Sequence, residues 1–191
     1  DLLPVLHLQP RAVDDRVAFA IAPLLVRHDQ RTAPVHDDEL TALPVGALVG
    51  LDDLEALRLE LPGHPQDAFY AAGTPWFFTL FGRDSIWAAR LSLPFDHSVA
   101  ASTLRVLARL QGTVTDPATA QQPGKILHEL RSAPLELPGE GVLLPPIYYG
   151  TVDATPLFVC LLADAWRAGM PEAEVRALLP ALRRALDWLL H

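Results

Sequence analysis

Four segments from residue 84 onward carry apolar residues at helical spacing, and they come in two pairs. In the first pair, residues 84–93 end before Pro94, and residues 98–110 carry an apolar stripe that is closed by Gly112. Because only a short link joins these two segments, they predict a helical hairpin.

The second pair predicts another hairpin. Residues 154–168 and 172–190 are joined by a short link in which Pro171 suits the first position of a helix. Pro180 lies inside the last segment and predicts a kink or a break there. Antiparallel helix pairs joined by alternating short and long loops indicate a mainly α fold, either an α/α toroid or an α-solenoid.

The first part of the chain has a different pattern. Residues 1–48 are punctuated by prolines and partly alternate between apolar and small residues, which predicts a β-rich segment or linker. From residue 51 leucines recur at helical spacing, so a short helix is expected over residues 51–61. We therefore expect a β-rich segment over residues 1–48 and a helical domain over residues 49–191.

Two further segments connect the predicted hairpins. Residues 124–131 are consistent with a short helix or a bend. Residues 133–146 predict a long loop, because Pro138-Gly139 and Pro145-Pro146 exclude regular structure.

Composition excludes several classes of partner. The formal net charge is −8, whereas a surface that binds phosphates needs an excess of Lys and Arg, so neither nucleic acid nor an anionic membrane is an expected partner. No apolar run approaches the roughly 18 residues of a membrane span, and the start lacks the basic region of a signal peptide, so we expect a cytoplasmic location. The lone Cys160 predicts a buried, inert thiol. No phosphate-cradling loop or dinucleotide fingerprint is present, so no cofactor is expected.

Two segments about sixty residues apart carry residue types that suit a sugar-binding pocket. The segments Thr74–Ser85 and Tyr148–Pro156 combine aromatic rings, glycine and carboxylates immediately before predicted helices. Aromatic rings, here Trp76 and Tyr149 among others, can lie against the apolar faces of a pyranose, while charged groups fix the orientation of its hydroxyls. The pair therefore predicts a carbohydrate-binding site.

Asp153 has two interpretations. It lies at the expected start of a helix, where Asp commonly acts as an N-cap. Its apolar and aromatic neighbours, including Tyr148 and Phe158, would alternatively desolvate the carboxyl and raise its pKa, as a general acid requires. Both interpretations can hold together.

The adjacent Arg83 and Asp84 form a second candidate. Either Asp84 caps the helix and pairs with Arg83, or both side chains enter a pocket and hold vicinal hydroxyls. Trp76, Phe77 and Phe78 could supply a stacking platform, although core packing is the expected role for at least two of the three.

The segment Pro123–Arg131 gathers Lys125, His128 and Glu129, which would share one face if the segment were helical. This segment is either a solvent-exposed helix or a loop that contacts the sugar. His128 and Glu129 are too few ligands for a metal site, so no metal is expected.

Three ordered blocks, PWFFTLFGRDS at residues 75–85, PGKILHE at 123–129 and YYGTVDATP at 148–156, resemble bacterial amylo-α-1,6-glucosidase or glycogen-debranching-type proteins. The resemblance covers roughly residues 50–191. It implies the N-terminal part of a glucoamylase-like (α/α)6 barrel and inverting hydrolysis of α-glucosidic bonds in an α-glucan or oligosaccharide.

The resemblance also implies roles for single residues. Asp153 falls on the general acid of the family, and Arg83 and Asp84 fall on the pair that holds the terminal glucose in the −1 subsite. Trp76 and Glu129 are assigned to the pocket wall.

Inversion needs a second carboxylate about 6.5–9.5 Å from the acid. In the family that base lies far downstream, whereas this chain stops at His191 in a helical pattern without a stop signal. We therefore expect a chain truncated at its C-terminus, without the base and inactive alone; Glu129 and Asp84 are the remaining motif carboxylates.

Three other expectations stay open. The substrate would be a small α-glucoside if the fold is right but the specificity differs, and the chain would be a glucan-binding fragment if it is not catalytic. An unclosed toroid would also expose large apolar faces, which predicts self-association.

Overall fold

The computed structural model describes residues 53–137, 139 and 142–191. The predicted β-rich segment over residues 1–48 lies outside these described residues.

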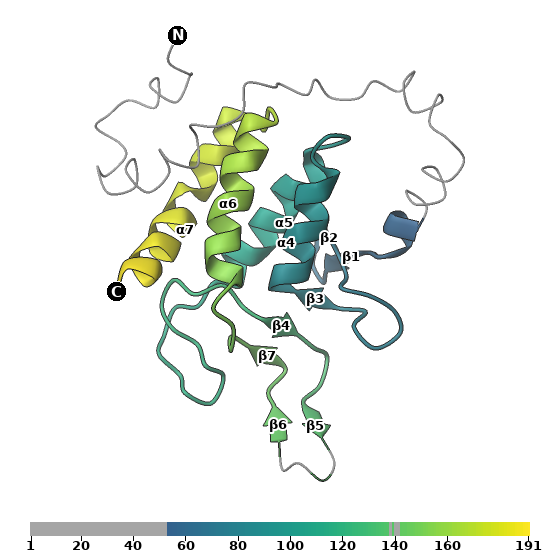
Figure 1. The fold of residues 1–191 in the computed structure, drawn as a ribbon, viewed down its shortest axis with the longest axis vertical. Helices are drawn as coiled ribbons and strands as arrows, with labels where there is room; N and C mark the ends of the chain where they lie inside the picture. The colour runs from purple at the N-terminus through teal and green to yellow at the C-terminus, as the bar shows by residue number, and fades with distance from the viewer. Residues whose placement is uncertain (1–52, 138, 140–141) are drawn as a thin grey trace. The chain divides into compact units, whose positions relative to one another are not determined.

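Two helical hairpins form the main part of the described structure, as predicted (Figure 1). The first hairpin consists of α4 (Gly82–Ser92) and α5 (Ser98–Arg109), and the second consists of α6 (Ala154–Arg167) and α7 (Glu172–Leu190). Small antiparallel sheets accompany them, so the described fold contains both α and β structure with a helical core.

Of the kink or break predicted at Pro180, the break is wrong, because α7 continues through this residue. Pro180 is exposed, so the carbonyl of Arg176 that loses its intrahelical partner can be hydrated. The opposite side of the helix is held by buried residues such as Leu178 and Leu182. Packing of this face therefore keeps the helix intact.

The helix predicted over residues 51–61 is also largely wrong. Of the described part, residues 53–61, only 53–56 are helical, and β1 (Arg58–Leu61) then pairs antiparallel with β2 (His64–Tyr70). Gly63 turns the chain between the two strands with a φ of 80°. Strand pairing and the packing of β2 on α5 override the local helical spacing.

Residues 133–146 form a hairpin rather than an irregular loop. β5 (Leu135–Leu137) pairs antiparallel with β6 (Val142–Leu144), and Gly139 takes a φ of 87° between them. Pro145 and Pro146 follow β6 and do not interrupt it, so the ladder needs no N–H from either.

A three-stranded sheet joins the ends of the two hairpins. Its order is β3 (Leu80–Phe81), β4 (Glu129–Leu130) and β7 (Ile147–Tyr148), with antiparallel pairing throughout. β3 runs directly into α4 and β7 precedes α6, so both helices begin beside the sheet (Figure 1).

Apolar side chains between the four helices make the core. The fully buried ones include Ile86, Leu104, Leu107, Phe158, Leu161 and Ala185. Cys160 is partly buried, and this burial raises the pKa of its thiol. Within the described residues, every helix is too short or too polar to cross a membrane.

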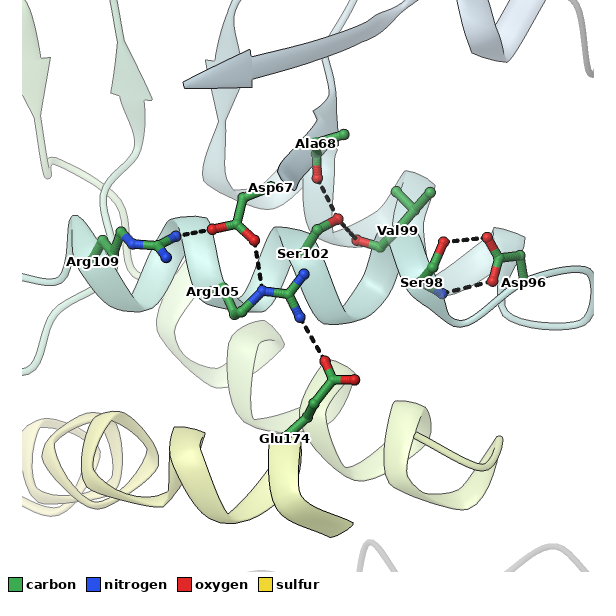
Figure 2. Close-up of polar contacts among 9 residues, drawn as sticks. All are labelled: Asp67, Ala68, Asp96, Ser98, Val99, Ser102, Arg105, Arg109 and Glu174. Carbon is green, nitrogen blue, oxygen red and sulfur yellow. Dashed lines mark hydrogen bonds and ion pairs between the residues drawn. The ribbon is translucent and has the colours of Figure 1, made fainter. Parts of the chain in front are cut away.

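An ion-pair network ties β2 to α5 and α7 (Figure 2). The buried Asp67 accepts hydrogen bonds from Arg105, at 2.6 Å between Oδ1 and Nε, and from Arg109. Arg105 also contacts Glu174 of α7 at 2.6 Å. Burial acts to raise the pKa of Asp67, but the hydrogen bonds and charges of the two arginines outweigh it and hold this pKa below its ordinary value.

Candidate functional site

The three-stranded sheet brings the three sequence blocks together. The N–H of Gly82 donates to the carbonyl of His128 at 2.8 Å, and the N–H of His128 donates to the carbonyl of Tyr148 at 2.8 Å. A Cβ on Gly82 would lie 2.2 Å from the carbonyl oxygen of Leu127, so only glycine allows this approach. Of the short helix or bend predicted over residues 124–131, the helix is therefore wrong and the bend is confirmed, because the chain bends at His128 and then enters β4.

A charged cluster lies where α4 and α6 begin. The guanidinium of Arg83 stands between two carboxylates, with Nη1 3.3 Å from Oδ2 of Asp153 and Nε 3.5 Å from Oδ2 of Asp84. The hydroxyl of Thr151 donates to the other oxygen of Asp153. All three charged side chains are partly exposed, so a ligand can reach them.

Neither carboxylate acts as a helix cap. Asp153 occupies the N-cap position of α6 but its side chain makes no capping hydrogen bond. Phe81 is the N-cap residue of α4, which places Asp84 inside the first turn. The capping interpretation is therefore wrong for both side chains, while the pairing of Asp84 with Arg83 is confirmed.

The electrostatics of Asp153 differ from the expectation. Partial burial acts to raise its pKa, but the hydrogen bond from Thr151 and the charge of Arg83 outweigh burial, so the pKa is lowered. The raised pKa that we expected for a general acid is therefore wrong for this arrangement, in which Asp153 is ionised at neutral pH.

Three aromatic rings of the segment before β3 face solvent. Trp76 is 79% exposed, Phe77 51% and Phe78 44%, so the expected core packing of at least two of them is wrong. The reason is a tight turn: Gly73 and Phe77 exchange backbone hydrogen bonds at 3.0 and 3.1 Å, which keeps the intervening residues off the core. Phe77 packs edge-on against Phe81 at 5.8 Å and so adjoins the start of α4.

The rings of Phe81, His128 and Tyr148 form an aromatic wall, with His128 in the middle. Its ring packs edge-to-face against Phe81, with centroids 5.5 Å apart, and against Tyr148 at 6.1 Å. Its Nδ1 is buried and has no hydrogen-bond partner among the described residues. This nitrogen is therefore an unpaired polar atom next to the cluster.

Two other residues that were predicted to contact the sugar, Glu129 and Tyr149, instead make hydrogen bonds within the fold. Glu129 is 2% exposed and accepts a hydrogen bond from Arg131 at 2.8 Å. Tyr149 is buried, its hydroxyl donates to the carbonyl of Leu110 at 2.6 Å, and burial raises its pKa. Neither side chain reaches the exposed face of the cluster.

Lys125 faces α7 rather than sharing a face with His128 and Glu129. Its Nζ donates to the carbonyl of Ala120 at 3.2 Å and lies 5.6 Å from the ring of Trp188. Burial lowers the pKa of Lys125. The shared face is therefore wrong, because residues 125–128 are not helical and only a helix would align these side chains.

Sequence reasoning missed a hollow at the end of α7. Trp188 donates from Nε1 to Oε1 of Gln122 at 2.6 Å, which joins α7 to the segment before β4. No local pattern marks this site, because its two sides lie about sixty residues apart. Its lining residues are Thr115, Gln122, Pro123, Asp187, Trp188 and His191.

Among the described residues, no group of three or more His, Cys, Asp or Glu side chains gathers as metal ligands would. Comparison of the chain with protein-family models and with curated proteins finds no match. Function is therefore inferred from the geometry of Arg83, Asp84, Asp153 and the aromatic wall.

Proposed function

We propose that this chain is the N-terminal part of an (α/α)6 glycoside hydrolase that cleaves α-glucosidic bonds with inversion. One observation carries the proposal: three separate sequence blocks meet at one sheet and present Arg83, Asp84 and Asp153 together, while aromatic rings of the first block are exposed. Charged groups next to exposed rings suit a neutral, hydroxyl-rich ligand, because hydroxyls accept charge-assisted hydrogen bonds and sugar faces stack on rings.

The helices support the toroid in a further way. α4 leaves Trp87 and Leu91 exposed, and Phe95, which follows this helix, is also exposed. Apolar side chains in such a row are normally covered, here by further helices of a closed toroid or, in this chain alone, by self-association.

In the proposed reaction Asp153 donates a proton to the glycosidic oxygen, and Arg83 with Asp84 orients the hydroxyls of the sugar. The base that activates water is supplied from outside this chain. Trp76 stacks on the sugar next to the scissile bond.

Hydrolysis of a glycogen limit dextrin tests this proposal. The assay compares this chain with its natural extension beyond His191 and follows glucose release and its anomeric form. Activity that requires the extension and releases β-glucose supports the proposal, and Asp153→Asn in the extended form should lower the rate by about 10²–10⁴. Asp187→Asn removes an exposed carboxylate elsewhere and serves as the control.

The lowered pKa of Asp153 favours one alternative, a non-catalytic glucan-binding module, because an ionised carboxylate binds hydroxyls without donating a proton. Saccharide binding without turnover in the extended chain, weakened by Asp153→Asn, would select this alternative.

A further inference from the structure

Arg83 is divided between two carboxylates. Its contacts with Asp153 and Asp84 measure 3.3 and 3.5 Å, both longer than the roughly 2.7–2.9 Å of a well-formed charge-assisted hydrogen bond. One cation therefore serves two anions, and it is fully paired with neither.

The surroundings give the guanidinium a second position. Oδ2 of Asp84 is buried and accepts no hydrogen bond in the described structure, so it would gain a donor if Arg83 moved fully toward it. Thr151 binds the other oxygen of Asp153 and so holds this carboxyl in place without help from Arg83. Movement of Arg83 would change the charge near Asp153 but not the orientation of the Asp153 carboxyl.

Other titratable groups on the adjoining elements are already engaged or are aromatic. On β4, Glu129 is paired with Arg131, and His128 packs between two rings. On β7, Tyr148 contributes one of these rings. Arg83 is thus the cation that the structure sets against Asp153.

We propose that Arg83 is a positioning residue that decides whether Asp153 carries a proton, by moving to Asp84 when a hydroxyl-rich ligand occupies the site. This inference rests on the proposed function, since it explains how an ionised Asp153 becomes a general acid. Once the guanidinium leaves, Oδ2 of Asp153 takes one proton from solvent, and this proton is the one later given to the glycosidic oxygen.

The lowered pKa of Asp153 agrees with this geometry. Burial alone would raise this pKa, and the hydrogen bond from Thr151 together with the charge of Arg83 reverses its effect. Removing the Arg83 contribution leaves burial opposed by the hydrogen bond from Thr151 and by a backbone hydrogen bond at Asp153.

Carboxyl NMR on the ligand-free chain tests the role of Arg83 without any sugar. The titration midpoint of Asp153 should move upward in Arg83→Gln and stay low in Arg83→Lys, which keeps the charge. The matched control is Arg90→Gln, which removes another arginine of α4 whose Nε lies 2.6 Å from Asp164 of α6. A midpoint that is equal in wild type, Arg83→Gln and Arg90→Gln would overturn the proposal.

Calorimetric titration with maltotriose, in two buffers of different ionisation heat, tests the movement. Wild type should take up as much as one proton per bound sugar, and its affinity should rise by up to about tenfold per pH unit as the pH falls. Arg83→Gln should take up fewer protons because Asp153 is already more protonated before binding.

The outcomes separate the two proposals. Binding without proton uptake would overturn the movement of Arg83 and leave the glycosidase proposal standing. Absence of saccharide binding would contradict both the proposed function and the ligand-driven movement of Arg83. Even then, a titration midpoint of Asp153 that rises in Arg83→Gln would show that Arg83 controls the protonation of Asp153.

Discussion

Replacing Asp67 by Asn should destabilise the fold by about 2–3 kcal/mol at pH 7. The side chain of Asp67 is 4% exposed and accepts hydrogen bonds from two arginines (Figure 2). Each charge-assisted hydrogen bond is worth about 1.5–3 kcal/mol. Two such bonds would sum to about 3–6 kcal/mol. The loss should lie at or below the low end of this sum, because Asn retains one acceptor oxygen and both arginines can reach water.

Removing both arginines should be more damaging than removing Asp67. The double variant Arg105→Gln with Arg109→Gln leaves a buried carboxylate without a cation, which costs about 3–5 kcal/mol. The control is Glu172→Gln, which breaks an exposed pair with Arg176 and should change stability by less than about 0.5 kcal/mol. Urea unfolding followed by circular dichroism measures all three.

The effect of Asp67→Asn should also depend on pH. Because the folded pKa of Asp67 lies below its ordinary value of 3.8, its stabilisation is complete above that value and is lost as the pH falls through the folded pKa. The gap between wild type and Asp67→Asn should therefore close in acid. A gap that is the same at pH 7 and in acid, or a loss below about 0.5 kcal/mol at pH 7, would refute the reasoning.

Three further predictions concern the candidate site. Gly82→Ala should destabilise the chain by about 3 kcal/mol or more in urea unfolding, since its Cβ would collide with a backbone carbonyl, and wild-type stability would contradict the described approach. Trp76→Ala should leave stability within about 0.5 kcal/mol but weaken maltotriose binding several-fold by calorimetry; unchanged binding would exclude stacking on this ring. Thr151→Val should raise the NMR titration midpoint of Asp153, because it removes the donated hydrogen bond, and an unchanged midpoint would show that this bond contributes nothing.

Helical periodicity was sufficient to predict the two hairpins. The bounds of α5 and α7 follow from the apolar stripes and from Pro171, because these helices bury one face along their whole length. Residues 51–61 carried the same spacing, but Arg58–Leu61 form a strand, because Gly63 and the pairing with β2 decide the local structure there. Short apolar segments do not by themselves distinguish helix from strand.

The candidate site was predictable in part. Local pattern singled out Arg83, Asp84 and Asp153, but their meeting depends on β4, whose two residues carry no strand signal of their own. The exposure of Trp76 was missed because its turn depends on backbone hydrogen bonds across residues 73–77 that composition does not reveal. The low pKa of Asp153 likewise depends on a cation that lies 70 positions away in the sequence.

The pairing of β4 on both sides limits where this chain can change its length in evolution or engineering. A single inserted residue between Gly124 and Glu129 would shift the register against β3 and β7 and turn each side chain of β4 to the other side of the sheet. The hairpin of β5 and β6 joins only to itself, so residues added near Gly139 would extend it without moving either neighbour of β4. Sequence length should therefore be fixed before β4 and variable after it, which makes the turn at Gly139 the natural place to graft a new segment.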